Sequence, residues 1–113
     1  MKIYHNPRCK KSRAGLQYLE EKGIEPEIVK YLKDQPFTEE SLKKILQKLN
    51  KSPQEIIRTQ EKVYKEQFKG KNFTEAEWIK ILVEYPKLIQ RPVVEDKYKA
   101  VIGDPPENID SLL

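Results

Sequence analysis

One cysteine and the basic residues around it are the side chains of this sequence best suited to chemistry. Cys9 is the single cysteine among the 113 residues. Four cationic side chains stand within four residues of its sulfur: Arg8, Lys10, Lys11 and Arg13. A thiolate is far more nucleophilic than a thiol, and nearby cations favour the charged form. The stretch therefore predicts a reactive thiolate that acts on an anionic substrate.

The alternative is that Cys9 is a small apolar side chain in the core, which is a common state for a free cysteine. Its neighbours argue against this, because Arg8 and Lys10 could not follow the sulfur into a core without leaving charges uncompensated. A lone cysteine also cannot form an internal disulfide. Any disulfide in a working cycle must therefore join Cys9 to another molecule.

The elements on either side of Cys9 place it where a thiolate is stabilised. Residues 2–5 are typical of a short strand, and apolar residues recur at helical spacing over 12–20. Cys9 then lies in a strand-to-helix loop, close to the unpaired N–H groups and the positive dipole end of the helix. The same position suits an oxyanion.

The order of the remaining elements predicts an α/β fold. Gly23 ends the first helix, and a second strand over 25–32 completes a βαβ unit with parallel strands. A helical block follows over about 38–86, with Thr38 and Thr74 as helix caps. Residues 88–95 enter a strand through Pro92, and this strand forms a hairpin with a strand over 98–102 before a terminal helix. We expect one domain, 1–113, with a four-stranded mixed sheet covered by helices and a helical insertion between the βαβ and ββα units.

Composition narrows the class of protein. The net charge of +4 comes from 22 basic and 18 acidic residues, mostly interspersed, so we expect no nucleic-acid binding. The sequence carries no apolar run of membrane-spanning length and begins directly in strand-like residues, so we expect a cytoplasmic, monomeric protein without membrane contact. One cysteine and one histidine do not make a metal site, and the four glycines form no nucleotide-binding pattern.

Three stretches resemble the glutaredoxin-linked arsenate reductase family, nearly end to end and in the right order. They are residues 4–13, residues 57–66 around Ile57-Arg58, and residues 86–94 around Arg91-Pro92. The resemblance implies a thioredoxin/glutaredoxin-like fold and a cysteine, Cys9, that attacks arsenate. It also implies that Arg58 and Arg91 hold the oxyanion, that His5 helps to lower the pKa of Cys9, and that Pro92 is the cis-proline beside the active site.

The sequence departs from this family at Asp104, where many members carry a third arginine. An anion in place of a cation reverses one Coulomb contribution to oxyanion binding. Arg8 and the neighbouring basic residues are candidates for compensating it, and we count Arg8 and Ser12 among the substrate-binding residues. Ser12 occupies the place of the second cysteine in a C-x-x-C pair, where its hydroxyl either donates to the thiolate or caps the helix.

Three functions are consistent with these residues. The first is reduction of arsenate through a Cys9 adduct, with no bound cofactor, glutathione as co-substrate and glutaredoxin as the partner that clears the mixed disulfide. The second is a monothiol, glutathione-linked oxidoreductase with another substrate, which Asp104 favours. The third is a non-enzymatic regulator that binds RNA polymerase, by analogy with a related family of this fold. His5, Arg58 and Arg91, taken singly, are also compatible with purely structural roles.

Overall fold

The computed structural model describes residues 1–34 and 36–113 and divides the chain into two compact units. The first unit contains Met1–Pro36 and Arg91–Leu113, and the second contains Phe37–Gln90. The second unit carries the helical block that the sequence predicts over 38–86. The expectation of a single domain stays a prediction.

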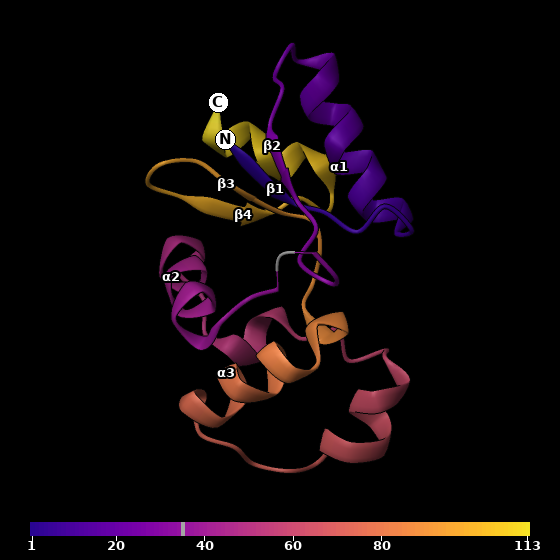
Figure 1. The fold of residues 1–113 in the computed structure, drawn as a ribbon, viewed down its shortest axis with the longest axis vertical. Helices are drawn as coiled ribbons and strands as arrows, with labels where there is room; N and C mark the ends of the chain where they lie inside the picture. Colours follow the sequence, from indigo (N-terminus) through magenta and orange to yellow (C-terminus); the bar gives the residue numbers. More distant parts are fainter. Residues whose placement is uncertain (35) are drawn as a thin grey trace. The chain divides into compact units, whose positions relative to one another are not determined.

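The first unit is built on a four-stranded mixed sheet (Figure 1). Its strands are β1 (Lys2–Tyr4), β2 (Glu27–Val29), β3 (Val93–Glu95) and β4 (Ala100–Ile102), in the spatial order β2-β1-β3-β4. β1 pairs in parallel with β2, whereas β1 with β3 and β3 with β4 are antiparallel. The βαβ unit, the hairpin and the fold class are thus confirmed.

Two helices pack on this sheet. They are α1 (Lys10–Glu21) and the 3-10 helix η4 (Pro106–Leu112), which Figure 1 shows against the strands. The core between sheet and helices consists of fully buried Ile3, Leu19, Val94 and Ile109. These residues come from β1, α1, β3 and η4, so this packing fixes the position of α1 on the sheet. The start of α1 therefore has a defined place beyond the end of β1.

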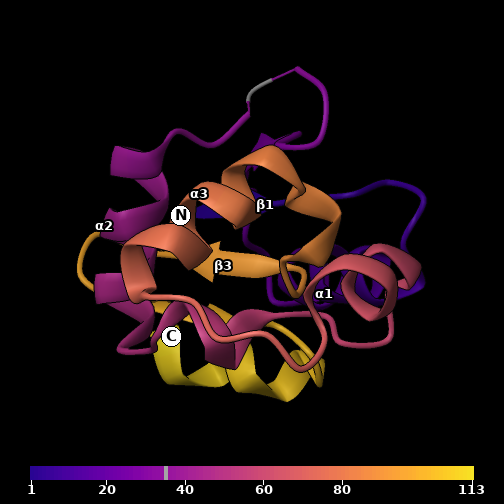
Figure 2. The ribbon, with the colours of Figure 1, turned by 90° about the horizontal axis from the view of Figure 1, so that it is seen from below.

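The second unit is helical, with α2 (Glu39–Leu49) beside α3 (Glu75–Glu84), as Figure 2 shows. Three short helices complete it: η1 (Pro53–Ile56), η2 (Tyr64–Phe68) and η3 (Pro86–Leu88). Both predicted caps are confirmed, since Thr38 and Thr74 each accept the N–H of the residue three positions on. Trp78, predicted as a core residue, is buried among aromatic rings.

The structure refines the bounds of two predicted elements. The stretch 88–95, predicted to enter a strand through Pro92, joins the sheet from Val93 on, because Pro92 has no N–H for a sheet ladder. Its first residues instead belong to the second unit, where Ile89 forms an isolated bridge with Ile57. The helix predicted over 61–68 is present over 62–68, where two α-helical residues lead into the π-helical turn Tyr64–Phe68. Gly70, at a φ of +78°, follows that turn.

Candidate functional site: a thiolate at the start of α1

Cys9 is the N-cap residue of α1, one position before the first helical residue. Its backbone N–H donates to the carbonyl of Asn6 over 3.0 Å, and its carbonyl accepts the N–H of Arg13 over 3.0 Å. The side chain is half-buried, so it is neither a core residue nor a freely exposed one. The core alternative for Cys9 is therefore wrong, because loop and helix geometry keep the sulfur at the surface of the unit.

The pKa of Cys9 is lowered below that of an ordinary thiol. Burial, the largest single influence, raises it, but a hydrogen bond from the Arg91 side chain and backbone N–H donors from Ser12 and Lys11 outweigh that effect. The charge of Arg91 lowers it further. The N–H groups are the unpaired donors of the first helical turn. The N-terminus of α1 and the Arg91 side chain together thus stabilise the Cys9 thiolate.

The basic side chains next to Cys9 in sequence have other surroundings. Arg8, Lys10, Lys11 and Arg13 are all exposed. The Arg13 guanidinium donates to the carbonyl of Pro7 over 2.9 Å, and Lys11 is paired with a carboxylate. The stabilising charge comes instead from Arg91, which is 82 positions away in the sequence and which the fold brings to the sulfur. The prediction that the cations next to Cys9 in sequence supply the charge that stabilises the thiolate is therefore wrong.

Ser12 and His5 form a buried hydrogen-bonded pair behind the loop. The Ser12 hydroxyl lies 2.6 Å from His5 Nδ1 and accepts the backbone N–H of Asn6 over 3.0 Å. The direction of the bond between His5 and Ser12 depends on the imidazole tautomer, because a hydroxyl has one proton to donate and two lone pairs that accept. Ser12 does not cap α1, whose N-cap residue is Cys9, so that alternative is wrong. It meets the sulfur through its backbone N–H.

The pKa of His5 is lowered, first by burial and then by the positive charges of Lys30 and Arg13. A histidine whose pKa lies below the ordinary value of about 6.5 is neutral near pH 7. His5 therefore supplies no positive charge to the thiolate at that pH. Its backbone N–H also donates to Val29 of β2 over 2.9 Å, and its side chain holds Ser12. The structure thus gives His5 the contacts of a positioning residue.

Arg91 owes its direction to the residue that follows it. The Arg91–Pro92 peptide bond is cis, as the resemblance implies. Pro92 is buried against α1, where a Cβ on Gly15 would lie 2.6 Å from its Cγ. On its other side, the Gly103 N–H donates to the Pro92 carbonyl over 2.7 Å. The contacts of Pro92 with α1 and with Gly103 therefore hold the Arg91–Pro92 segment so that Arg91 meets Cys9.

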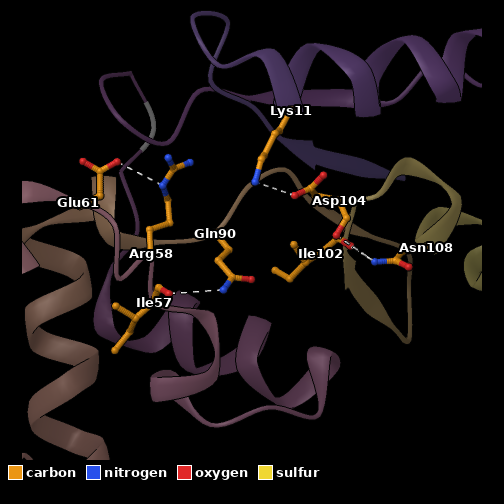
Figure 3. Close-up of polar contacts among 8 residues, drawn as sticks. All are labelled: Lys11, Ile57, Arg58, Glu61, Gln90, Ile102, Asp104 and Asn108. Carbon is orange, nitrogen blue, oxygen red and sulfur yellow. Dashed lines mark hydrogen bonds and ion pairs between the residues drawn. The ribbon is translucent and has the colours of Figure 1, made fainter.

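Arg58, the other predicted oxyanion ligand, belongs to the second unit. Its backbone N–H donates to the Leu88 carbonyl over 2.6 Å, and its Nε lies 3.2 Å from a carboxylate oxygen of Glu61, as Figure 3 shows. Gln90 supports the segment by donating to the Ile57 carbonyl over 3.4 Å. The structure thus brings together Cys9, Arg91, His5 and Ser12 in the first unit. The approach of Arg58 to the sulfur, and the roles of Arg8 and Ser12 with substrate, stay predictions.

Sequence reasoning missed two features of the loop and its rim, which are the role of Asn6 and the partner of Asp104. Asn6 organises the loop, since its side-chain oxygen accepts the N–H of Arg8 over 3.1 Å and its carbonyl accepts the N–H of Cys9. Asn before proline is a turn signal and could have indicated it. The second is the Lys11 partner Asp104, whose carboxylate lies 3.0 Å from the Lys11 ammonium (Figure 3). No sequence spacing relates these two residues.

Other kinds of site are not seen in the part of the chain that the structure describes. Residues 1–34 and 36–113 contain no group of three or more histidine, cysteine, aspartate or glutamate side chains placed to hold a metal ion. Within the same ranges, no helix combines the length and the apolar character that a membrane crossing requires.

Fold and site together define a class: a thioredoxin-like α/β protein with one cysteine at the N-terminus of its first helix and a cis-proline beside it. The ArsC family profile matches residues 4–112, and the chain belongs to this family. It is 42% identical over 115 residues to an arsenate reductase of Neisseria meningitidis serogroup B, covering 100% of this chain and 97% of that one. It is 43% identical over 111 residues to the uncharacterized protein YfgD of Escherichia coli K12, covering 96% and 92%.

A solved structure gives the same result for the fold. The arsenate reductase from Vibrio cholerae superposes with a TM-score of 0.92 at 38% identity and covers 100% of this chain and 98% of its own. The thioredoxin-like architecture predicted from the resemblance is therefore confirmed.

Proposed function

We propose that this protein is an arsenate reductase that uses the Cys9 thiolate as its nucleophile. The observation that carries the proposal is the convergence on one sulfur of a guanidinium, from Arg91, and two helix N–H groups, from Lys11 and Ser12. This arrangement lowers the pKa of Cys9, which raises the fraction of thiolate, and it offers positive potential to a tetrahedral oxyanion that approaches the sulfur. Relatives named arsenate reductase at about 40% identity support the choice of substrate.

The reaction balances through a sulfur–arsenic intermediate. The Cys9 thiolate attacks arsenic(V), one arsenate oxygen leaves as water after protonation, and a sulfur–arsenic bond forms. The glutathione thiolate then attacks the Cys9 sulfur; the sulfur–arsenic bond breaks and its electron pair stays on arsenic, which leaves as arsenite, arsenic(III). The two sulfurs are oxidised to a Cys9–glutathione disulfide. Glutaredoxin thiols reduce it, and Cys9 leaves as thiolate. Arg58, which the resemblance predicts as an oxyanion ligand, is also proposed to bind oxygens of the substrate.

The lone cysteine supports the need for external thiols, since no second cysteine can resolve the intermediate. We place the reaction in the cytoplasm, because glutathione and thioredoxin-type systems keep thiols reduced there. The proposal includes a monomer that requires no bound cofactor.

The test is arsenate-dependent NADPH oxidation in the presence of glutathione, glutaredoxin and glutathione reductase. We expect turnover by the natural chain and none by Cys9→Ser, because a serine hydroxyl is not ionised at neutral pH. Arg91→Met should lower kcat/KM about 10- to 100-fold, which corresponds to losing a charged hydrogen bond at the reacting atom. Lys97→Met, at an exposed lysine of the β3–β4 hairpin, is the matched control and should behave as the natural chain.

An equal rate in Cys9→Ser would refute the proposed chemistry. If the natural chain is inactive with arsenate yet exchanges rapidly with glutathionylated peptides, the second function is favoured, a glutathione-linked thiol oxidoreductase. Asp104 is the specific residue that motivates this alternative, because its carboxylate opposes oxyanion binding.

A further inference from the structure

Asp104 and Lys11 form an ion pair at the rim of the Cys9 site. The Lys11 Nζ lies 3.0 Å from Asp104 Oδ2, and the two side chains are 53% and 37% exposed. Lys11 is tied to the thiolate, because its own backbone N–H donates to the Cys9 sulfur. Asp104 follows Gly103, whose N–H holds the carbonyl of Pro92. Lys11 is therefore connected directly to the Cys9 sulfur. Asp104 is connected, through Gly103 and Pro92, to the segment that carries Arg91.

The backbone of Asp104 is held more firmly than the side chain of Lys11. The Asn108 amide donates to the carbonyl of Ile102 over 3.1 Å and to that of Asp104 over 3.3 Å, which closes the turn between β4 and η4 (Figure 3). Gly103 is buried in the same turn, where a Cβ would lie 3.1 Å from Pro92 Cγ. A lysine has four flexible methylenes, whereas the carboxylate of aspartate is one carbon from its backbone. Asp104 thus determines where the Lys11 ammonium lies.

The pair changes the charge that an incoming anion meets. Without Asp104, the Lys11 ammonium would add one uncompensated positive charge at the first turn of α1, whose backbone N–H groups meet the Cys9 sulfur. With Asp104 the two charges cancel, and Arg91 and the helix N–H groups of the first unit provide the attraction. A doubly charged anion loses about twice as much from this cancellation as a singly charged anion of the same shape.

The geometry points to Asp104 as a specificity-determining residue that, by holding Lys11, reduces the preference of the Cys9 site for doubly charged over singly charged tetrahedral anions. This inference rests on the proposed function, since it assumes that a tetrahedral anion binds beside Cys9. It adds a charge class of substrate. The site accepts the monoanion of a tetrahedral oxyacid with little disadvantage relative to the dianion.

The experiment measures how anions protect Cys9 from alkylation by iodoacetamide, with no arsenate, glutathione or turnover. Sulfate and perchlorate serve as probes because both are tetrahedral, whereas sulfate carries two negative charges and perchlorate carries one. Rates are compared at one pH and constant ionic strength, because screening changes the interaction between exposed charges. The variants are Asp104→Asn, Lys11→Met and the double variant. Thermal unfolding of each verifies that it is folded.

We expect Asp104→Asn to tighten protection by sulfate about two- to fivefold, in the range of exposed ion pairs, and protection by perchlorate by less. Lys11→Met should weaken sulfate protection by a similar factor, because it leaves the carboxylate without its partner. Protection by sulfate in the double variant should be close to that in the natural chain, since removing both charges leaves the net charge of the pair at zero. Asp110→Asn is the control for total charge: Asp110 pairs with Lys22 over 4.0 Å, and Lys22 is about 16 Å along α1 from Lys11.

The outcomes separate this inference from the proposed function. Equal protection by sulfate in the natural chain and all variants would overturn the role of Asp104 while leaving the anion site intact. So would a shift of equal size for sulfate and perchlorate, or a shift of equal size in Asp110→Asn. Protection by neither anion in any variant would overturn the oxyanion site itself, and with it both the proposed function and this inference.

Discussion

At the scale of single residues, the chemistry of the candidate site depends on which groups are charged. Arg91 carries a permanent charge and bonds to the Cys9 sulfur, whereas His5 is a buried, neutral residue that holds Ser12. A neutral histidine at this buried position avoids placing a positive charge near Lys30 and Arg13, the two residues whose charges lower its pKa. The Arg91 cation thus stabilises the thiolate, whereas the His5 imidazole positions the loop.

The lowered pKa of His5 predicts acid sensitivity of the fold. A group whose pKa is lower in the folded state stabilises the protein above its unfolded pKa, and this contribution is lost as the pH falls through the folded value. The free energy of unfolding should therefore decrease as the pH falls below about 6.5. His5→Gln, which cannot be protonated, should flatten the curve in this window. His5 is the single histidine, so no other imidazole obscures the comparison.

The measurement is urea unfolding at several pH values between 5 and 8 for the natural chain and His5→Gln. The variant should be less stable at pH 7.5, because a buried hydrogen bond to Ser12 is disturbed, at a cost of about 1–3 kcal/mol. Identical slopes against pH between 5 and 6.5 in the two proteins would show that His5 is not the titrating group.

At the scale of elements, the site depends on how closely α1 approaches the segment that carries Arg91. Gly15 lies on the face of α1 that meets Pro92, and its missing side chain permits the contact. The end of β4 meets the same proline through Gly103. A glycine inside a helix lowers helix propensity by about 1 kcal/mol relative to alanine. Close packing is the physical reason for accepting that cost here.

Gly15→Ala should destabilise the protein even though alanine favours helices. The new Cβ would lie 2.6 Å from Pro92 Cγ, a ring atom that cannot rotate away, so α1 or the Arg91–Pro92 segment must shift. Overpacking of this kind costs about 1–3 kcal/mol, which exceeds the gain in propensity. The shift should also slow alkylation of Cys9, because Arg91 moves relative to the sulfur.

Urea unfolding and the rate of iodoacetamide alkylation measure these two effects. Gln17→Ala, at an exposed position of the same helix, is the control for helix propensity and should change neither quantity by much. A Gly15→Ala protein more stable than the natural chain would mean that the contact with Pro92 yields without strain.

At the scale of the whole molecule, the count of cysteines and the division into two units decide how the site can work. One thiol serves the whole chain, so any disulfide of Cys9 joins it to another molecule. The first unit holds the thiolate and Arg91, and the second holds Arg58 with Glu61. Of the two arginines that the resemblance predicts as oxyanion ligands, Arg91 therefore belongs to the first unit and Arg58 to the second.

Oxidised glutathione should convert the protein to a one-to-one mixed disulfide at Cys9. The lowered pKa makes the thiolate available for attack at neutral pH, and the half-buried sulfur is accessible to a tripeptide. Intact-mass spectrometry should show a single added glutathione, which glutaredoxin removes, and no adduct with Cys9→Ser. A predominance of Cys9–Cys9 dimers, or an unmodified protein, would contradict the proposed route through a glutathione disulfide.

Local sequence signals determined much of this architecture. Helix caps at Thr38 and Thr74, the stop at Gly23 and the hairpin before the terminal helix are set by residues within a few positions of one another. Cys9 at the start of α1 follows in the same way, because the end of a strand and the beginning of a helix can both be read from periodicity. The family motif then pointed to Arg91 and Pro92.

Tertiary structure alone decided which of the nearby charges matters to the thiolate. Four cations adjacent to Cys9 in sequence are exposed, whereas Arg91, from the far end of the chain, bonds to the sulfur. The same holds for Asp104, which pairs with Lys11 across 93 positions, and for Ser12, whose hydroxyl meets His5 rather than capping α1. The physical reason is that hydrogen bonds and ion pairs act over a few ångströms, and the packing of α1 against β1, β3 and η4 determines which distant residues come that close.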